Sequence, residues 1–283
     1  MLLRSVVAPG KLVLVGEYAV VDGAPAIVAA VDRGVRCDVF EGDGLETPGD
    51  DTFVRAALVG APRGRYRFAD ANPVTGLSGK PGFGGSAAAT VAAVVAAGLP
   101  AERAFSVHEM VQGGGSGIDV FAAVHGGVRR FRDGAEVACP PLVAVWSGQS
   151  ASTGSRVALY RAWTGRAAFV EASRSLVQAF PAEPFRAARE AYALLRAMAA
   201  DAGLAYDLPI FAEINALAAQ FGGAAKPSGA GGGDVAVVLL PDPDARAAFN
   251  AAAASAGLVT IAVNVAPGAS ATAAPRGAPD PAP

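Results

Sequence analysis

The chain has 283 residues, 52% of them hydrophobic and 17% charged, so it can bury a large core and exceeds the usual size of one domain. Its formal net charge of −2 gives no global basic field that would attract nucleic acid or an anionic membrane. The two cysteines and two histidines show no metal-ligand spacing, which argues against a disulfide framework or a zinc site and fits a reducing cytoplasm.

The first forty residues predict β-strands. Residues 12–15, 26–31 and 35–40 are rich in β-branched side chains and are separated by Gly, Pro and Asp turns. Residues 41–80 are more polar and are interrupted by Gly and Pro. We therefore expect loops there, with one short helix near 53–58.

The alanine-rich run 86–98 is apolar on every face, as expected for a buried helix, and is shorter than the ~20 residues of a membrane span. A second helix is predicted over 103–111, before a run of glycines that would end it. Short strands are predicted at 128–131 and 142–146.

Helical periodicity dominates after about residue 150. The predicted helices cover 155–163, 169–180, 184–202 and 209–220. They are followed by a strand at 234–240, a helix at 242–256 and a strand at 259–265.

Strands followed by helices predict an α+β protein in two halves. We place an N-terminal domain at 1–140 and a C-terminal domain at 141–267. Residues 268–283 are rich in Pro, Ala and Gly and have little to bury, so we expect a disordered tail there.

The strongest local signal is a glycine turn, Lys80-Pro-Gly-Phe-Gly-Gly, that opens into the helix at Ser86. A helix N-terminus offers unpaired backbone N–H groups and the positive end of the helix dipole, and glycines let an anion approach closely. Together these features form a phosphate cradle. The Ser86 hydroxyl could ligate a magnesium ion that bridges the phosphates. An ordinary loop that enters a core helix is the alternative.

Two known phosphate loops can be compared with this segment. The pattern G-x-x-x-x-G-K-[ST] is absent from the chain. Gly82, Gly84 and Ala87 match the dinucleotide fingerprint G-x-G-x-x-A, but residues 75–80 do not predict the strand that should precede it. This argues against a dinucleotide site.

Three further segments carry candidate chemistry. Asp119 follows a glycine turn, and it is either a helix cap or a catalytic carboxylate aimed into a cleft. Residues 226–234 hold four glycines almost side by side, which indicates close approach of the backbone to a ligand or to another loop. Lys11 stands at the start of a strand, where an exposed lysine usually has no special role.

Taken in order, these segments resemble the motifs of the GHMP kinase family, named for galactokinase, homoserine kinase, mevalonate kinase and phosphomevalonate kinase. Residues 8–18 resemble the first motif, 80–88 the second and 226–234 the third. Residues 115–119 resemble the region of the catalytic aspartate. The resemblance covers about residues 6–267.

Within the family, the details most resemble the phosphomevalonate kinase branch. Gly16-Glu-Tyr18, Gly115-Ser-Gly-Ile-Asp119 and Gly231-Gly-Gly-Asp234 are typical of that branch. Gly85, in contrast, stands where the family usually has the first serine of a pair, and the segment between the first two motifs is short.

The resemblance implies an N-terminal domain like ribosomal protein S5 domain 2 and a ferredoxin-like C-terminal domain. It implies ATP-dependent phosphorylation of 5-phosphomevalonate to 5-diphosphomevalonate, on the mevalonate route to isoprenoids, with Mg²⁺. The expected protein is a cytoplasmic monomer or homodimer that binds a small phosphorylated acid and neither nucleic acid nor membrane.

The family's site residues can be placed by these motifs. Asp119 would accept or orient the proton of the attacking oxygen, Lys11 would neutralise charge on the reacting oxygens, and Ser86 would hold the metal. Contacts to ATP are expected from Lys80, Gly82, Gly84, Gly85, Ser86 and Ala87. Contacts to the substrate are expected from Ser116, Gly117, Ser228, Gly229, Ala230 and Gly231.

A phosphorylated acceptor needs basic side chains to hold it. Lys80 is the first candidate for such a clamp. Arg129, Arg130 and Arg132 are alternatives that could equally form a solvated strand face.

Two alternatives stay open at the level of sequence. The protein could be a mevalonate kinase or another GHMP small-molecule kinase. It could also be a non-catalytic nucleotide-binding homologue, as Gly85 and the short 41–80 segment would allow.

Overall fold

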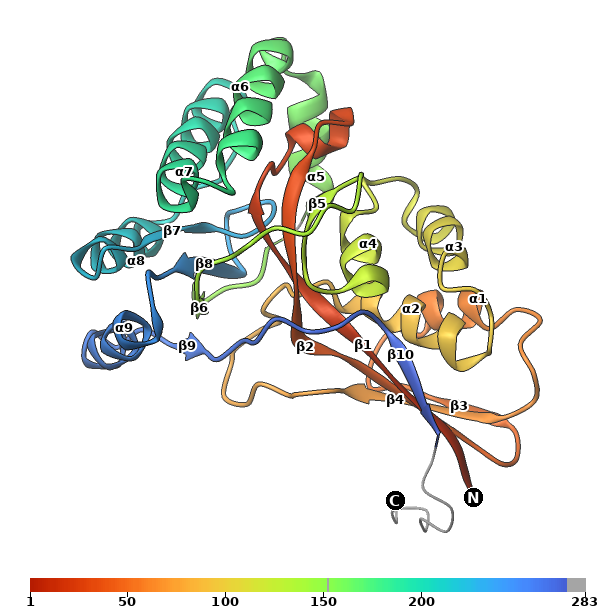
Figure 1. Ribbon diagram of the computed structural model, residues 1–283. Helices are drawn as coiled ribbons and strands as arrows, with labels where there is room; N and C mark the ends of the chain where they lie inside the picture. The colour runs from red at the N-terminus through yellow and green to blue at the C-terminus, as the bar shows by residue number, and fades with distance from the viewer. Residues whose placement is uncertain (152, 274–283) are drawn as a thin grey trace.

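The computed structural model describes residues 1–151 and 153–273. Its first sheet is built on two long antiparallel strands, β1 (Leu2–Val15) and β2 (Ala26–Phe40), which pair along nearly their whole length. The order of the path is β10-β1-β2-β4-β3, and β5 pairs with the other end of β2 (Figure 1). The shorter strands are β3 (Gly44–Glu46), β4 (Arg65–Asp70), β5 (Val128–Phe131) and β10 (Ser270–Ala273).

Four helices lie together on one side of this sheet (Figure 1). The central one, α2 (Gly85–Ala96), packs on β1 and β2. Its many alanines bring the helix close to the strands, and they are buried in a shared apolar core. The others are α1 (Thr52–Ala57), α3 (Arg103–Gln112) and α4 (Ile118–His125).

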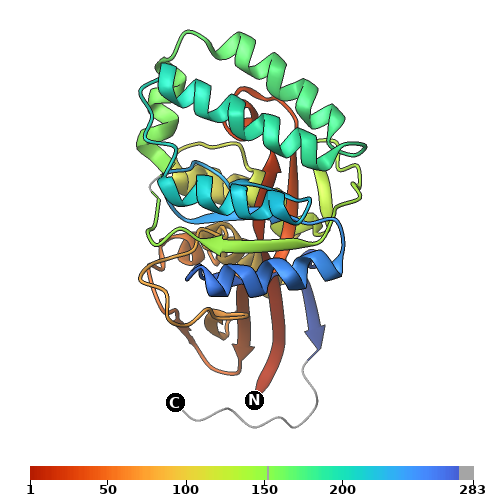
Figure 2. The same ribbon diagram turned by 90° about the vertical axis from the view of Figure 1, so that its left-hand side faces the viewer.

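The second sheet is antiparallel, in the order β7-β8-β6-β9. Its strands are β6 (Leu142–Trp146), β7 (Ala224–Pro227), β8 (Val235–Leu239) and β9 (Thr260–Ile261). Helices of the second half run across its outer side in Figure 2. They are α7 (Pro184–Asp201), α8 (Pro209–Gln220) and α9 (Pro243–Ser255). Helix α6 (Arg166–Ala179) packs beside α7, and α5 (Thr153–Ala162) lies beside the end of β1 (Figure 1).

The strands of the first sheet are longer than the sequence pattern indicates. Residues 26–40 form one strand, although Asp32-Arg33-Gly34 predicts a turn. The pairing of β1 and β2 shifts register between Ala8 and Gly10, and a Cβ on Gly34 would lie 2.0 Å from the Ala8 carbonyl oxygen. Gly34 therefore allows two backbones to come close at an irregularity inside the sheet, and it does not mark a turn that reverses the chain.

Two expectations about loops were wrong. Residues 41–80 contain β3 and β4 as well as α1, because these short strands are stabilised by backbone pairing that composition does not reveal. The expected tail from residue 268 begins too early, since 270–273 form β10 on the free edge of β1. Residues 274–283 of that tail lie outside the described part of the chain.

A buried ion pair joins the two sheets. Glu17, just after β1, contacts the ammonium of Lys226 in β7, and the two side chains are 2% and 0% exposed. The Lys226 Nζ also donates to the Pro227 carbonyl at 2.9 Å. Burial lowers the pKa of Lys226, and the Glu17 carboxylate opposes that shift.

A hydrogen bond from the Val13 N–H to the Ser228 Oγ, 2.9 Å long, adds to this junction. Together the contacts fix the end of β1 against the segment that follows β7. Across 1–151 and 153–273, no helix has the length and apolar character needed to span a membrane.

The junction yields a stability prediction. Lys226→Met would leave the Glu17 carboxylate buried without its counter-charge, and we expect a loss of ~3–5 kcal/mol in the free energy of unfolding in urea. Adding Glu17→Gln should restore a large part of that loss. Arg174→Met, which breaks only an exposed pair with Glu171, should cost at most ~1 kcal/mol. A loss as small as that of Arg174→Met would show that the buried pair does not hold the sheets together.

Candidate functional site

A cleft of about 1050 Å³ is lined by residues from both halves of the chain. One wall comes from β1 and from the loop that leads into α2. Another comes from the start of α4, and a third from the segment after β7. The three glycine-rich motifs and the lysine of the first motif therefore meet around one space.

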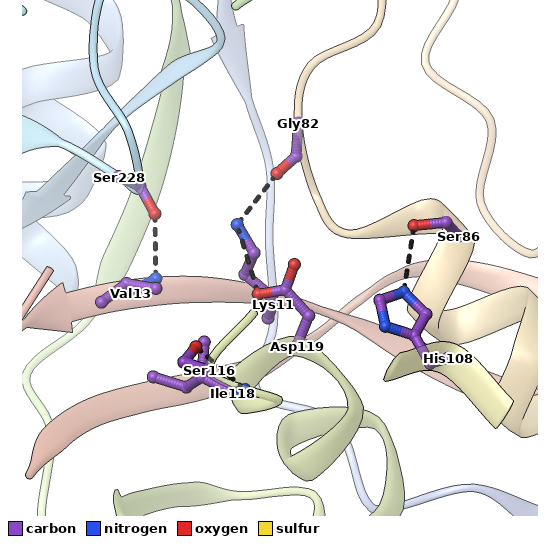
Figure 3. Close-up of polar contacts among 9 residues, drawn as sticks. All are labelled: Lys11, Val13, Gly82, Ser86, His108, Ser116, Ile118, Asp119 and Ser228. Atoms are coloured by element: carbon purple, nitrogen blue, oxygen red, sulfur yellow. Dashed lines mark hydrogen bonds and ion pairs between the residues drawn. The ribbon is translucent and has the colours of Figure 1, made fainter. Parts of the chain in front are cut away.

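Lys11 and Asp119 face each other in this cleft (Figure 3). The Lys11 Nζ lies 3.9 Å from the Asp119 Oδ1 and donates a hydrogen bond of 3.2 Å to the Gly82 carbonyl. A Cβ on Gly84 would lie 3.3 Å from the Lys11 Cγ and 3.5 Å from the Asp119 Oδ2. The phosphate loop thus runs directly beside the two charged side chains.

The loop is held on β1 by backbone contacts. The Lys11 N–H donates to the Phe83 carbonyl at 2.9 Å. Gly10 makes this approach possible, because a Cβ there would lie 2.7 Å from the same carbonyl oxygen. The strand that carries Lys11 therefore also fixes the position of the loop.

Helix α2 begins at Gly85, one residue earlier than expected, after Gly84 in the left-handed conformation with φ of 77°. The N–H groups of residues 85–87 point out of the first turn without an intrahelical acceptor, as at any helix start. The Ala88 N–H is the first to bond within the helix, to the Gly84 carbonyl. This end of α2 can receive an anion such as a phosphate.

Ser86 has a neighbour that the motifs do not reveal. Its Oγ lies 3.4 Å from the Nε2 of His108 in α3 (Figure 3). The imidazole also packs against Phe53, with ring centroids 4.9 Å apart. Burial lowers the pKa of His108, with the Asp119 carboxylate opposing the shift. The contact joins residues 22 apart in sequence, so only the fold makes it visible.

Asp119 stands in the first turn of α4 and is not the cap of that helix. The cap position is taken by Gly117 with φ of 78°, and no side chain caps the helix. Asp119 therefore lines the cleft, and its catalytic role stays a prediction.

The third glycine-rich segment approaches both the cleft and other parts of the protein. A Cβ on Gly229 would lie 3.7 Å from the Lys11 Nζ, whereas Cβ atoms on Gly231 and Gly232 would lie 2.2 Å from the Tyr206 ring and from Arg156. Most of these glycines therefore serve packing within the protein. The phenolic O–H of Tyr18 donates to the Ala230 carbonyl at 2.6 Å and holds the segment over the cleft.

Most of the predicted site residues line the cleft. They are Lys11, Gly82, Gly84, Ser86, Ser116, Gly117, Asp119, Ser228, Gly229 and Ala230. The hydroxyls of two of these already have backbone partners, since Ser116 accepts from the Ile118 N–H and Ser228 from the Val13 N–H.

Four predicted residues do not line it. Ala87 is fully buried in the α2 core, Gly85 is exposed, and Gly231 is buried against Tyr206. Lys80 lies in a loop tied to Ser150, whose Oγ accepts from the Lys80 N–H at 2.8 Å. Any contact from Ala87 to a ligand would have to come from its backbone, and the roles of the four stay predictions.

The three arginines proposed as alternative clamps differ in their ion-pair partners and in whether they reach the cleft. Arg129 pairs with Glu136, and Arg130 pairs with Asp133. Only Arg132 among the three lines the cleft. Further cleft residues that sequence reasoning missed are Glu17, Tyr18, His108, Arg161 and Asp234.

The donors in the cleft meet the modest requirement of a magnesium ion bound with phosphates. In the described part of the chain, no three His, Cys, Asp or Glu side chains come together as a metal site. Magnesium in phosphoryl transfer needs one or two protein oxygens, the rest coming from phosphates and water. The Ser86 hydroxyl and the Asp119 carboxylate fit that role.

The chain is similar in sequence to known kinases of small molecules. No protein-family model matches the chain. The chain is 29% identical to a phosphomevalonate kinase from Streptomyces sp. (strain CL190), over 82% of this chain and 88% of that protein. It is 31% identical to a mevalonate kinase from Aeropyrum pernix, over 45% of this chain and 50% of that protein.

Solved structures show the same fold. The phosphomevalonate kinase of Streptococcus pneumoniae, in complex with phosphomevalonate and AMPPNP, matches with a TM-score of 0.71 at 16% identity. The match covers 94% of this chain and all of that one. At 16% identity, this similarity supports the fold alone, and the reaction has to be argued from the residues of the cleft.

A prediction concerns the turn before α2. Gly82 has φ of +79°, and a Cβ there would lie 2.3 Å from the Asp234 Oδ2, which is held in place because Asp234 Oδ1 accepts from the Ala151 N–H. Gly60 has φ of +76° with nothing within 4 Å. Gly82→Ala should therefore cost ~1–3 kcal/mol more unfolding free energy than Gly60→Ala, the range for overpacking. Equal losses in urea denaturation would mean that the loop has room to move.

Proposed function

We propose that this chain, a GHMP kinase homologue most similar to phosphomevalonate kinase, transfers the γ-phosphoryl group of ATP to 5-phosphomevalonate. The two-domain α+β fold that the sequence motifs imply is confirmed by its structural neighbours. The observation that carries the proposal is the meeting of Lys11, Asp119 and the α2 N-terminus in one cleft.

The nucleotide phosphates would lie on the start of α2. The N–H groups of residues 85–87 and the helix dipole supply fixed positive potential at that place. Gly84 allows the phosphates to come close to Lys11, because no side chain stands between the loop and the ammonium. A Mg²⁺ ion held by Ser86 would neutralise charge on the phosphates.

The acceptor would attack from the Lys11 side. One oxygen of its phosphate forms a bond to the γ-phosphorus, the bond from that phosphorus to the bridging oxygen breaks, and ADP leaves. Lys11 stabilises the negative charge on the equatorial oxygens, and Asp119 accepts any proton that the acceptor still carries. Most of the rate enhancement in such a transfer comes from positioning and electrostatic stabilisation.

The choice of acceptor rests on the relatives. The phosphomevalonate kinase relative matches most of this chain and most of its own length, whereas the mevalonate kinase relative matches about half of each. Structural neighbours do not separate the two acceptors, because one was solved with phosphomevalonate and another with mevalonate, both at a TM-score of 0.71. The fuller match to the phosphomevalonate kinase is therefore the observation that favours a phosphorylated acceptor.

A coupled assay of ADP release tests this assignment. Purified protein with Mg·ATP is offered phosphomevalonate, mevalonate, homoserine and galactose in turn. We expect turnover with phosphomevalonate to exceed that with each of the others by at least tenfold in kcat/KM. Preference for mevalonate would reassign the substrate, and nucleotide binding without turnover on any of the four would favour a non-catalytic homologue.

Substitutions at the centre of the cleft test the roles within the site. Lys11→Ala and Asp119→Asn should each lower kcat by about 10²-fold or more. The first removes positive charge that stabilises the transferred group, and the second removes the carboxylate that accepts or orients the proton of the acceptor. The thermal unfolding midpoint should change little, since the pair is 3.9 Å apart and Asp119 is partly exposed. Rates like those of the unsubstituted protein in both variants would remove the two residues from the reaction.

A further inference from the structure

The cleft extends well beyond the reacting centre. From Lys11 the chain continues along β1 to Val15, a distance of about 13 Å at ~3.3 Å per residue. It then turns into η1 (Ala19–Asp22), a short 3₁₀ helix at the tip of the strand. In Figure 1 the tip lies beside the labelled elements α5 and β5. We call this part of the cleft the distal end, and its lining residues are Val20, Val21, Phe131, Arg132, Val157 and Arg161.

Four of these six side chains are apolar, and two are arginines. Val20 and Phe131 are buried, and Val21 and Val157 are half-buried. This lining suits a short hydrocarbon segment between two charged ends of a ligand.

The acidic residues near the distal end already have partners. Asp22 accepts from the Tyr160 hydroxyl at 2.8 Å and pairs with Arg166 at 3.2 Å. Asp133 pairs with Arg130, and Glu17 pairs with Lys226. None of these carboxylates is left to balance the two arginines that line the cleft.

Arg132 and Arg161 have no carboxylate within ion-pair distance among residues 1–151 and 153–273. The Arg132 guanidinium lies over the Phe131 ring, 5.2 Å from its centroid, which orients the group without neutralising it. Arg161 stands in the last turn of α5 and lines the same cleft. Both side chains are exposed to the cleft opening and can meet a ligand.

We propose that Arg132 and Arg161 bind a carboxylate at the far end of the acceptor. The inference rests on the proposed function, because the acceptor's phosphate must then lie beside Lys11 and the γ-phosphoryl group. A six-carbon acid, together with the reach of an arginine side chain, spans the distance from there to the distal end. Guanidinium groups match carboxylates in shape and charge and can bind them through two parallel hydrogen bonds.

The distal end thereby makes the cleft specific for acceptors with an anionic group at each end of a short branched carbon chain. Lys11 recognises the phosphate of the acceptor, while the arginines recognise its carboxylate. Arg132 and Arg161 are residues for specificity, since they bind the end of the acceptor that does not react.

The test compares Arg132→Gln, Arg161→Gln and the double variant in steady-state kinetics with phosphomevalonate and ATP. We expect the KM for phosphomevalonate to rise about tenfold or more in at least one single variant and further in the double variant, as for loss of a hydrogen bond to a charged group. The KM for ATP and kcat should stay within twofold. Arg130→Gln is the matched control on β5, because Arg130 is paired with Asp133 and does not line the cleft.

A second acceptor separates direct recognition from a structural effect. The phosphorylated carboxamide, in which an amide replaces the carboxylate, should bind the unsubstituted protein as weakly as the acid binds the double variant. The arginine substitutions should then change the KM for the carboxamide only slightly.

The proposal would be overturned if the substitutions raised the KM for the acid and for the carboxamide equally, or if the double variant kept the KM for the acid unchanged. Either result would leave the turnover of phosphomevalonate, and so the proposed function, in place. Absence of turnover by the unsubstituted protein would instead refute the proposed function, and this inference with it.

Discussion

The buried pair of Glu17 and Lys226 is the constraint on which the site depends. It lies where β1 of the first sheet meets β7 of the second, and the Val13–Ser228 hydrogen bond lies next to it. Lys11 is two residues before Val13 on the same strand. Gly229, one residue after Ser228, consequently lies close to Lys11, since a Cβ added to it would be 3.7 Å from the Lys11 Nζ. Joining the sheets at this point thus determines how closely the first and third motifs approach each other.

The second motif is placed by the same strand. Gly10 lets the Phe83 carbonyl come close enough to accept from the Lys11 N–H, and the loop then turns at Gly84 into α2. The backbone of Lys11 therefore binds the phosphate loop, while its ammonium group faces the space for the ligand. Any displacement of β1 would move the lysine and the phosphate cradle together, which keeps their relative geometry constant.

Sequence reasoning predicted the parts of the site that local chemistry encodes. The glycine turn before α2, the carboxylate of Asp119 and the lysine of the first motif all carry recognisable patterns, and the structure brings them into one cleft. It failed where the decisive contact is distant in sequence. The His108–Ser86 contact, the Glu17–Lys226 pair and β10 on the edge of β1 all depend on pairings across 22 or more residues. The glycines at 231–233 were correctly interpreted as serving close approach, but only the fold shows that they pack on Tyr206, Arg156 and the 149–151 backbone.

The neighbour of Ser86 also affects how charge is balanced around a bound nucleotide. Burial lowers the pKa of His108, so the imidazole is favoured in its neutral form. Its Nε2 can then accept a hydrogen bond from the Ser86 hydroxyl. The serine oxygen then keeps its lone pairs for a cation. Because a neutral imidazole adds no charge, the positive potential for the phosphates would come from Lys11, the α2 N-terminus and the metal. Asp119 and Asp234 are carboxylates near Lys11 that oppose it. Arg132 and Arg161, which have no carboxylate partner in the described part of the chain, add positive charge at the distal end, where the acceptor's second anionic group would lie.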